Sequence, residues 1–401
     1  MKVAMVNTAR TLGGAAGMAS SLAVAVNNVQ KGVSTTLFHS EDRQRSETFY
    51  GLKKTGARPL SALLTRLGAT RRTADLGLAR ELSEIIENFD VLHVHNLHGY
   101  YVDYRALMKA WNERPLVWTW HDMWGATGRC AAVYECTLWQ SGCQQCPSPK
   151  GYPATWVDRA RQEFLDKQSI FLRNPNLYIV SPSQWLAQIA ISRGFRPDRV
   201  RVIPNPMDLD KCNPIPKDAA RKQLGLPLDK FVALFVASDC GNKRKGYEDF
   251  AHAVEQASVL GLALGKAPAK PAAGIRHLGR TTDSQLINLC YSASDVLVMP
   301  SYADNYPNTV IEAIANGTPV IGYDVGGVAS QLDNSFCRVV TKGDQNGLTL
   351  SLRSLRDQGG KTPQIAAELS AIALERWHPA VVAEQYIQVY QTANMRRENE
   401  Y

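Results

Sequence analysis

The chain has 401 residues, of which 45% are hydrophobic and 20% charged, a balance typical of globular proteins that excludes an intrinsically disordered chain. A single hydrophobic core stops growing below this length, so we expect two domains. The net charge of +8 favours anionic substrates, a membrane surface or nucleic acid as partners.

Short apolar runs alternate with helical patterns along the whole chain. In the first half the runs are 3–7, 33–38, 91–95, 116–120, 177–180 and 200–203. In the second half they are 231–237, 262–264, 275–278, 296–299, 320–323 and 337–340. Because they are β-branched and nearly continuous, we expect strands of parallel sheets buried on both faces. The pattern predicts an α/β protein with two doubly wound, Rossmann-like domains.

The N-terminal residues 1–7 have the character of a first strand, since they lack the apolar core and the cleavage site of a signal peptide. No uncharged apolar run approaches the ~20 residues that cross a bilayer. We therefore expect a cytoplasmic protein, with peripheral attachment to the inner face of the membrane left open.

A glycine-rich loop, Gly13-Gly14-Ala15-Ala16-Gly17, follows the first predicted strand and precedes an apolar helix over 18–26. Glycine lets a ligand approach the backbone closely, although any βα turn can use it. A dinucleotide fingerprint would need glycine at 13, 15 and 18, and Ala15 and Met18 break that pattern.

The segment 53–80 is strongly basic. Its basic residues are Lys53, Lys54, Arg58, Arg66, Arg71, Arg72 and Arg80, against the single acid Asp75. Leucines lie between them at helical spacing, so an amphipathic helix is expected. This helix either packs on its own domain with a solvated basic face or docks on anionic lipid.

Histidines lie in or directly after two of the predicted strands. His121 and Asp122 come directly after the strand 116–120, at the carboxyl edge where open α/β sheets bind ligands. His93 and His95 lie in the strand 91–95, and we expect them to support the site. A lone histidine is usually structural, but its place at a strand end favours a functional role for His121.

Four of the eight cysteines fall within 17 residues, at Cys130, Cys136, Cys143 and Cys146. In a reducing compartment such clustering favours zinc over disulfides. Four thiolates form a closed structural zinc site with no open position for water. The spacing is not that of a standard zinc finger, so free thiols and a redox role stay open.

Proline is dense in residues 204–216, which we interpret as the linker between a first domain, 1–203, and a second, 217–379. In the second domain a cationic loop, 238–246, follows a strand and precedes a helix that starts near Tyr247. Arg244 and Lys245 in this loop suit a pyrophosphate group, since arginine offers a bidentate fork and lysine a point charge.

The most informative segment is 301–319, which follows the strand 296–299. Asn308 is expected to cap a helix over 309–316, and Gly317 to adopt the left-handed conformation after it. A helix N-terminus suits phosphates, whereas the carboxylates of Asp304 and Glu312 on either side suit hydroxyls. The segment therefore predicts a site for a sugar phosphate or a nucleotide sugar.

The acid, seven residues and glutamate from Asp304 to Glu312 resemble the signature of the family-four retaining glycosyltransferases of bacterial polysaccharide biosynthesis. The resemblance implies the GT-B fold, in which two Rossmann-like domains face each other across a cleft and the last helix, here 380–395, packs back on the first domain. It also implies that Asp304 holds hydroxyls of the transferred sugar and that Glu312 holds the ribose. The surrounding residues Asn305, Tyr306, Pro307 and Asn308 belong to the same donor site.

The same resemblance extends to other loops. It places Gly13 and Gly14 near the donor phosphates and the acceptor, and His121 near the transferred sugar. Lys245-Gly246 matches the Lys-Gly pair of the family, but the arginine that often lies six positions earlier is replaced by Asp239. Either Arg244 or Lys243 would have to replace it. The first domain is then the acceptor side and the second binds the nucleotide.

The sequence thus predicts an enzyme that moves a sugar from a nucleotide diphosphate sugar to a saccharide, including a lipid-linked one, with no catalytic cofactor and no nucleic-acid partner. The catalytic candidates are His121, Lys245 and Asp304. One alternative is a sugar-nucleotide epimerase or phosphorylase on the same fold, which product analysis would separate. Another is a basic nucleic-acid-binding or membrane-binding protein, which would leave Asp304, Glu312 and the Lys-Gly loop unexplained.

Overall fold

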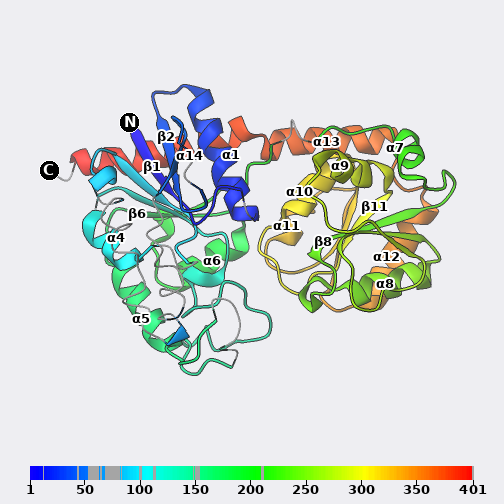
Figure 1. Ribbon diagram of the computed structural model, residues 1–401, viewed down its shortest axis with the longest axis horizontal. Coiled ribbons are helices and arrows are strands. Elements are labelled where there is room, and N and C mark those ends of the chain that lie inside the picture. Colours follow the sequence, from blue (N-terminus) through cyan, green and yellow to red (C-terminus); the bar gives the residue numbers. More distant parts are fainter. Residues whose placement is uncertain are drawn as a thin grey trace. The chain divides into compact units, whose positions relative to one another are not determined.

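The structure is a computed structural model, and it describes most of the chain. The residues outside the description are 12, 43–44, 53–62, 64–65, 68–81, 83, 99–101, 112–113, 148, 150–153, 209–211 and 400–401. The chain divides into two compact units. Unit 1 comprises Met1–Pro206 with Pro379–Tyr401, and unit 2 comprises Met207–His378 (Figure 1).

Unit 1 is built on a seven-stranded parallel sheet in the order β3-β2-β1-β4-β5-β6-β7. The strands are β1 (Lys2–Val6), β2 (Ser34–His39), β3 (Phe49–Gly51), β4 (Val91–Val94), β5 (Leu116–Thr119), β6 (Leu177–Ser181) and β7 (Val200–Val202). Every residue of β4, β5 and β6 is buried, which explains why these strands lack alternating polar residues.

Helices cover both faces of this sheet. They are α1 (Gly14–Val29), α4 (Tyr104–Trp111), α5 (Ala160–Phe171), α6 (Gln184–Ser192) and α14 (Pro379–Asn399). On one face, α1 and α14 enclose a core with Val3, Met5 and Val117. Figure 1 shows α14 running alongside α1, so the C-terminal helix completes the core of the unit that begins the chain.

Unit 2 has a six-stranded parallel sheet in the order β10-β9-β8-β11-β12-β13. The strands are β8 (Val232–Asp239), β9 (Leu260–Lys266), β10 (Ile275–His277), β11 (Val296–Met299), β12 (Val320–Tyr323) and β13 (Arg338–Val340). The helices are α7 (Lys217–Leu224), α8 (Tyr247–Ala257), α9 (Ser284–Ala293), α10 (Asn308–Ala315), α11 (Val328–Gln331), α12 (Gln345–Asp357) and α13 (Pro363–Trp377). The two sheets confirm the predicted α/β fold with two Rossmann-like domains.

Two local predictions were wrong by a short distance. Helix α1 begins at Gly14, so most of the expected glycine loop is its first turn, with Gly13 as the N-cap at φ +96°. Helix α10 begins at Asn308, and Pro307 rather than Asn308 is its N-cap, since the fixed φ of proline, here −67°, already leads the chain into the helix. Gly317 has φ +68°, as expected for the residue after the helix. Within the described residues no helix combines the length and apolar content that a membrane span requires.

Candidate functional site

Both sheets reverse their strand order at one point, and the loops at that point carry the candidate residues. In unit 1 the reversal lies between β1 and β4, and in unit 2 between β8 and β11. Ligands of open α/β sheets bind outside the carboxyl ends of the strands at such a reversal. The glycine turn after β1 and the histidines after β4 share this position in unit 1. The cationic loop after β8 and the segment 301–307 after β11 share it in unit 2.

In unit 2 the structure brings Lys245 and Asp304 into direct contact. The Lys245 ammonium donates to Oδ2 of Asp304 at 2.6 Å, and the Arg244 guanidinium lies 3.5 Å from Oδ1 of the same carboxylate. The side chains of Lys245 and Asp304 are only 23% and 15% exposed. The backbone supports the contact, because the amide of Tyr302 donates to the carbonyl of Arg244 at 2.8 Å. Two cations and one carboxylate are thus held at one point.

The structure distinguishes the two candidates for the role of the arginine that is missing at position 239. Asp239 ends β8 and accepts from the amide of Gly241 at 2.9 Å, so its side chain closes the turn. Lys243 is exposed, whereas Arg244 is part-buried and shares Asp304 with Lys245. Of the two candidates, Arg244 therefore has the position next to Lys245.

Sequence reasoning missed Asp249, which connects the helix after the cationic loop to the segment 301–307. It lies in the first turn of α8 and is buried. One carboxylate oxygen accepts from the hydroxyls of Tyr302 and Tyr323, both at 2.7 Å, and the other accepts from the amide of Gln345 at 2.6 Å. Such a fully paired carboxylate is well stabilised in the interior. An acid in a first helical turn is common, so its sequence position alone gave no signal.

A pair of glycines after β12 was missed as well. Gly326 has φ +57°, and a Cβ there would collide with the carbonyl oxygen of Asp304. The amide of Gly327 donates to the carbonyl of Asn305 at 2.7 Å. These glycines therefore let the strand-to-helix turn approach and hold the backbone of the Asp304 loop. A Gly-Gly pair between a strand and a helix was the available signal.

Glu312 lies inside α10 and is paired within unit 2. Its Oε2 accepts from the hydroxyl of Tyr291 at 2.8 Å. Burial raises the pKa of the Glu312 carboxyl, while the hydrogen bond from Tyr291 acts in the opposite direction. The structure thus holds this carboxyl away from bulk water with one partner in place, an environment in which a further hydroxyl donor would be favourable.

The residues between Asp304 and α10 have mainly supporting contacts. The hydroxyl of Tyr306 accepts from the indole of Trp377 at 2.8 Å, and the carbonyl of Pro307 accepts from the amide of Gln331 at 3.2 Å. Asn308 is the first helical residue and is part-buried. The loop is therefore anchored directly before the helix start.

In unit 1 three histidines form what we call the imidazole cluster: His93, His95 and His121. Nδ1 of His95 lies 3.0 Å from Nε2 of His121, and the two rings are nearly parallel. The rings of His93 and His95 are 4.1 Å apart, measured between their centroids. Burial lowers the pKa of all three, to about 4 for His121, so each ring is neutral at pH 7.

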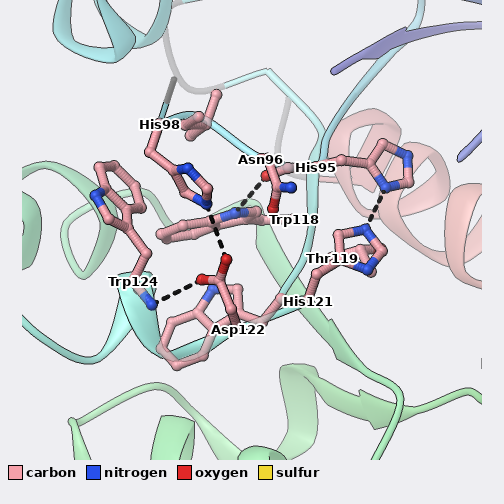
Figure 2. Close-up of a pocket in the computed structure, with 11 residues that line it drawn as sticks. His95, Asn96, His98, Trp118, Thr119, His121, Asp122 and Trp124 are labelled. Atoms are coloured by element: carbon pink, nitrogen blue, oxygen red, sulfur yellow. Dashed lines mark hydrogen bonds and ion pairs between the residues drawn. The ribbon is translucent and has the colours of Figure 1, made fainter. Parts of the chain in front are cut away.

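A small pocket opens beside this cluster, and Figure 2 shows His95, His98, His121 and Asp122 around it. Nε2 of His98 lies 2.8 Å from Oδ2 of Asp122, whose other oxygen accepts from the amide of Trp124 at 2.8 Å. The indoles of Trp118 and Trp124 also line the pocket. Polar groups beside aromatic faces are a combination that suits a saccharide hydroxyl.

The four-cysteine loop, 130–146, comes shortly after the last residue that lines this pocket, Gly125. All four of its cysteines are free thiols, and Cys143 accepts from the amide of Gly128 at 3.2 Å. The pKa of Cys130 is raised to about 11, mainly by burial, and the neighbouring cysteines act in the same direction. In the described part of the chain, no group of three or more His, Cys, Asp or Glu is arranged to hold a metal ion. Structural zinc in this loop stays a prediction.

Most of the basic segment 53–80 lies outside the described residues. Its described members include Leu63, Arg66 and Leu67, all exposed. The carbonyl of Arg66 accepts from the amide of Trp156, and its guanidinium lies 5.8 Å from the centre of that indole. Trp156 itself is 62% exposed.

Comparison with known families and proteins gives a consistent result. The model of Glycosyltransferase Family 4 matches residues 13–211, and that of Glycosyl transferases group 1 matches residues 268–364. WcaC of Escherichia coli (strain K12), whose name assigns it to colanic acid biosynthesis as a glycosyl transferase, is 29% identical over 320 residues, which cover 75% of this chain and 76% of WcaC. TuaC of Bacillus subtilis (strain 168), named for teichuronic acid biosynthesis, is 38% identical over 120 residues, 28% of this chain and 30% of TuaC.

Solved structures share the fold at low sequence identity. HepE of Anabaena, crystallised in complex with UDP, covers 98% of this chain and 100% of its own at a TM-score of 0.66 and 17% identity. Sucrose-phosphate synthase of Thermosynechococcus elongatus covers 98% of both chains at a TM-score of 0.67 and 18% identity. These likenesses show the GT-B fold, which has two Rossmann-like domains.

Proposed function

This chain belongs to the family-4 glycosyltransferases of polysaccharide biosynthesis, and on that premise we propose that it transfers a sugar from a nucleoside diphosphate sugar to a lipid-linked saccharide with retention of anomeric configuration. Glycosyl transfer follows from the family. The retention, the lipid-linked acceptor and the roles of single residues are the proposal.

The observation that carries the proposal is the contact of Lys245 and Arg244 with Asp304 at the strand reversal of unit 2. A diphosphate needs cations, and a sugar needs hydrogen-bond acceptors for its hydroxyls. The two requirements are met within one group of side chains. We assign Lys245 and Arg244 to the diphosphate, Asp304 to sugar hydroxyls and Glu312 to the ribose.

The chemistry then requires charge stabilisation more than a protein nucleophile. The bond between the anomeric carbon and the phosphate oxygen breaks, the acceptor oxygen attaches on the same face, and its proton passes to the leaving phosphate. Negative charge develops on that phosphate, and Lys245 and Arg244 are placed to stabilise it. A positioned electrostatic group of this kind typically contributes about 10²–10³-fold to the rate. No catalytic cofactor enters this scheme.

We assign the acceptor side to unit 1, where His121 and Asp122 line the pocket beside the imidazole cluster. HepE was also crystallised with UDP-glucose, which makes UDP-glucose the first donor to test. The test begins with a thermal-shift screen of UDP-, GDP-, ADP- and TDP-sugars. A ligand at 100 times its dissociation constant stabilises the protein by about 2.7 kcal/mol.

The donor that stabilises the chain is then incubated with a lipid extract from the source cells, and the anomeric configuration of the product is read by NMR. Retention supports the proposal, and inversion contradicts it. Release of an epimerised sugar nucleotide without an acceptor would favour the epimerase alternative. Binding of RNA with steep salt dependence, together with no stabilisation by any sugar nucleotide, would favour the nucleic-acid alternative.

A lipid-linked acceptor also calls for contact with a membrane surface, and exposed Leu63, Leu67 and Trp156 beside Arg66 support it. Apolar side chains next to a cation suit the boundary between headgroups and acyl chains. Co-sedimentation with vesicles of anionic and of zwitterionic lipid tests this. Equal binding to both kinds of vesicle, or binding to neither, would contradict an anionic membrane surface as the partner. The proposed peripheral location of the protein on the cytoplasmic face of the membrane would then have no support.

A further inference from the structure

The imidazole cluster is held from two sides of unit 1. Nδ1 of His93 lies 2.8 Å from the hydroxyl of Tyr390 on α14, and its Nε2 lies 2.8 Å from the hydroxyl of Thr119 on β5. The hydroxyl of Tyr386, also on α14, lies 3.0 Å from that of Thr119. Both ring nitrogens of His93 therefore have hydrogen-bond partners that hold the ring in place. The ring of His95 packs against it.

His95 is buried, and its two nitrogens differ. Nδ1 lies 3.0 Å from Nε2 of His121, while Nε2 has no hydrogen-bond partner among the described residues. The planes of the His95 and His121 rings differ by only 17°, and their centroids are 5.3 Å apart. That geometry places the contact between the nitrogens close to the plane of both rings, as a hydrogen bond between two imidazoles requires.

A neutral imidazole carries one N–H and one lone pair. Between His95 and His121 one nitrogen must therefore donate and the other accept. If His121 donated, His95 would carry its own proton on Nε2, and a buried N–H would lack an acceptor. If His95 donates, only a lone pair is left without a partner. Unpaired buried donors are rarer in native backbones than under-used acceptors, which favours the second arrangement.

We infer that His95 is a positioning residue that donates from Nδ1 to Nε2 of His121 and so fixes His121 in the tautomer with its proton on Nδ1. The tautomer itself does not depend on the proposed function, and only its consequence for catalysis rests on that function. His121 lines the pocket with Asn96, His98 and Asp122 (Figure 2). In this tautomer the single N–H of His121 is on Nδ1, and its single lone pair, on Nε2, is engaged by His95.

The consequence is chemical. A histidine whose lone pair is occupied does not take a proton from an acceptor hydroxyl, so His121 does not serve as a general base. In this tautomer His121 acts as a hydrogen-bond donor only. This agrees with a reaction in which the leaving phosphate receives the acceptor proton. His95 thus decides which of the two roles His121 can have.

The test is ¹⁵N NMR of the histidine side chains in the full-length protein at pH 7, with the His121 signals assigned by their loss in His121→Gln. The expected result is a protonated Nδ1 and an unprotonated Nε2 for His121. A proton on Nε2 of His121 would overturn the inference. This measurement needs no substrate and no variant of His95, so it stands even if the transferase assay fails.

Three variants then test the positioning role. His95→Phe keeps the ring volume but removes the donor, and we expect His121 to lose its single tautomer and kcat to fall at least 10-fold at an unchanged KM for the donor. His95→Gln retains an N–H donor and should restore both the tautomer and most of kcat. Tyr390→Phe is the matched control, since it removes a hydrogen bond of His93 without touching the contact between His95 and His121. A normal tautomer in His95→Phe, or the same loss in all three, would refute the role.

Discussion

Replacement of Lys245 by alanine should slow sugar transfer by about 10²-fold, and the structure indicates how that loss is composed. The Lys245 ammonium is 2.6 Å from the carboxylate of Asp304, and both side chains are largely shielded from water. A hydrogen bond to a charged group is worth about 1.5–3 kcal/mol, or about 10–100-fold. Lys245→Ala removes this bond and the charge that faces the leaving phosphate. Asp304→Asn keeps the shape and a weaker hydrogen bond, so about 10-fold is expected.

The double variant separates two explanations. If Lys245 and Asp304 bind different parts of the donor independently, their losses multiply to about 10³-fold. If the pair acts as one unit, the double variant is hardly slower than Lys245→Ala alone. The shared contact and the common support by Tyr302 lead us to expect the second outcome.

The assay is release of nucleoside diphosphate from the donor that the thermal-shift screen identifies, with kcat and KM measured separately. Lys222→Ala, an exposed charge on α7 of the same unit, is the control for a change in net charge. Equal rates for Lys245→Ala and Lys222→Ala would refute the assignment of the diphosphate to this loop. If the losses of Lys245→Ala and Asp304→Asn multiply fully in the double variant, the two residues do not act as one unit.

Glu312→Gln should weaken binding of the nucleotide sugar by about 10–100-fold in calorimetry while barely changing kcat, since a ribose contact is made equally in the ground and transition states; unchanged affinity would contradict the ribose assignment. Gly326→Ala should destabilise unit 2 by about 1–3 kcal/mol in urea unfolding and slow transfer, because its φ of +57° and the Asp304 carbonyl both exclude a side chain. Gly274→Ala is the control, because Gly274 has a similar φ of +76° but no atom lies within 4 Å of an added Cβ. Equal effects of Gly326→Ala and Gly274→Ala would show that the contact with the Asp304 carbonyl has no role. The imidazole cluster should make the protein less stable in acid, because the pKa values of its three histidines are lower in the folded protein than the ~6.5 of the unfolded chain. Between about pH 6 and pH 4.5 the unfolded chain therefore binds up to three more protons than the folded protein. The free energy of unfolding should fall by up to about 4 kcal/mol for each pH unit in this range. Urea unfolding from pH 7 to pH 5 checks this, and His95→Gln should reduce the slope by about one third. Elemental analysis should find one zinc per chain bound by the four-cysteine loop, and well under one zinc with four titratable thiols would exclude the metal.

The strands were predictable because their residues are buried on both faces, and burial on both faces demands apolar runs. The runs at 91–95, 116–120 and 296–299 correspond to β4, β5 and β11 within one residue. β3 (Phe49–Gly51) was missed, since three residues at a sheet edge carry too little pattern. The start of α10 moved by one residue because Asn and Pro both suit the entry to a helix, and the fixed φ of Pro307 decided between them.

The site was predictable where chemistry is concentrated in one loop, and it was not where contacts depend on topology. Lys245 and Asp304 were each identified, but they are 59 residues apart, and only the pairing of β8 with β11 brings them together. Asp249 has no unusual neighbours in sequence. Of its two tyrosine partners, Tyr302 follows β11 and Tyr323 is the last residue of β12. The roles of His93 and His95 depend on α14, whose tyrosines are almost 300 residues away.

The arrangement of charge at the donor side has a physical cause that applies before any ligand arrives. Cations assembled to bind a diphosphate repel one another, and partial burial makes their repulsion stronger. Asp304 offsets this repulsion, because one of its carboxylate oxygens contacts Lys245 and the other contacts Arg244. Since the same carboxylate is assigned to sugar hydroxyls, the ligand finds its cations already oriented and its acceptor already charged. Orientation fixed in advance costs no reorganisation during the reaction, which is the condition under which electrostatic groups accelerate it most.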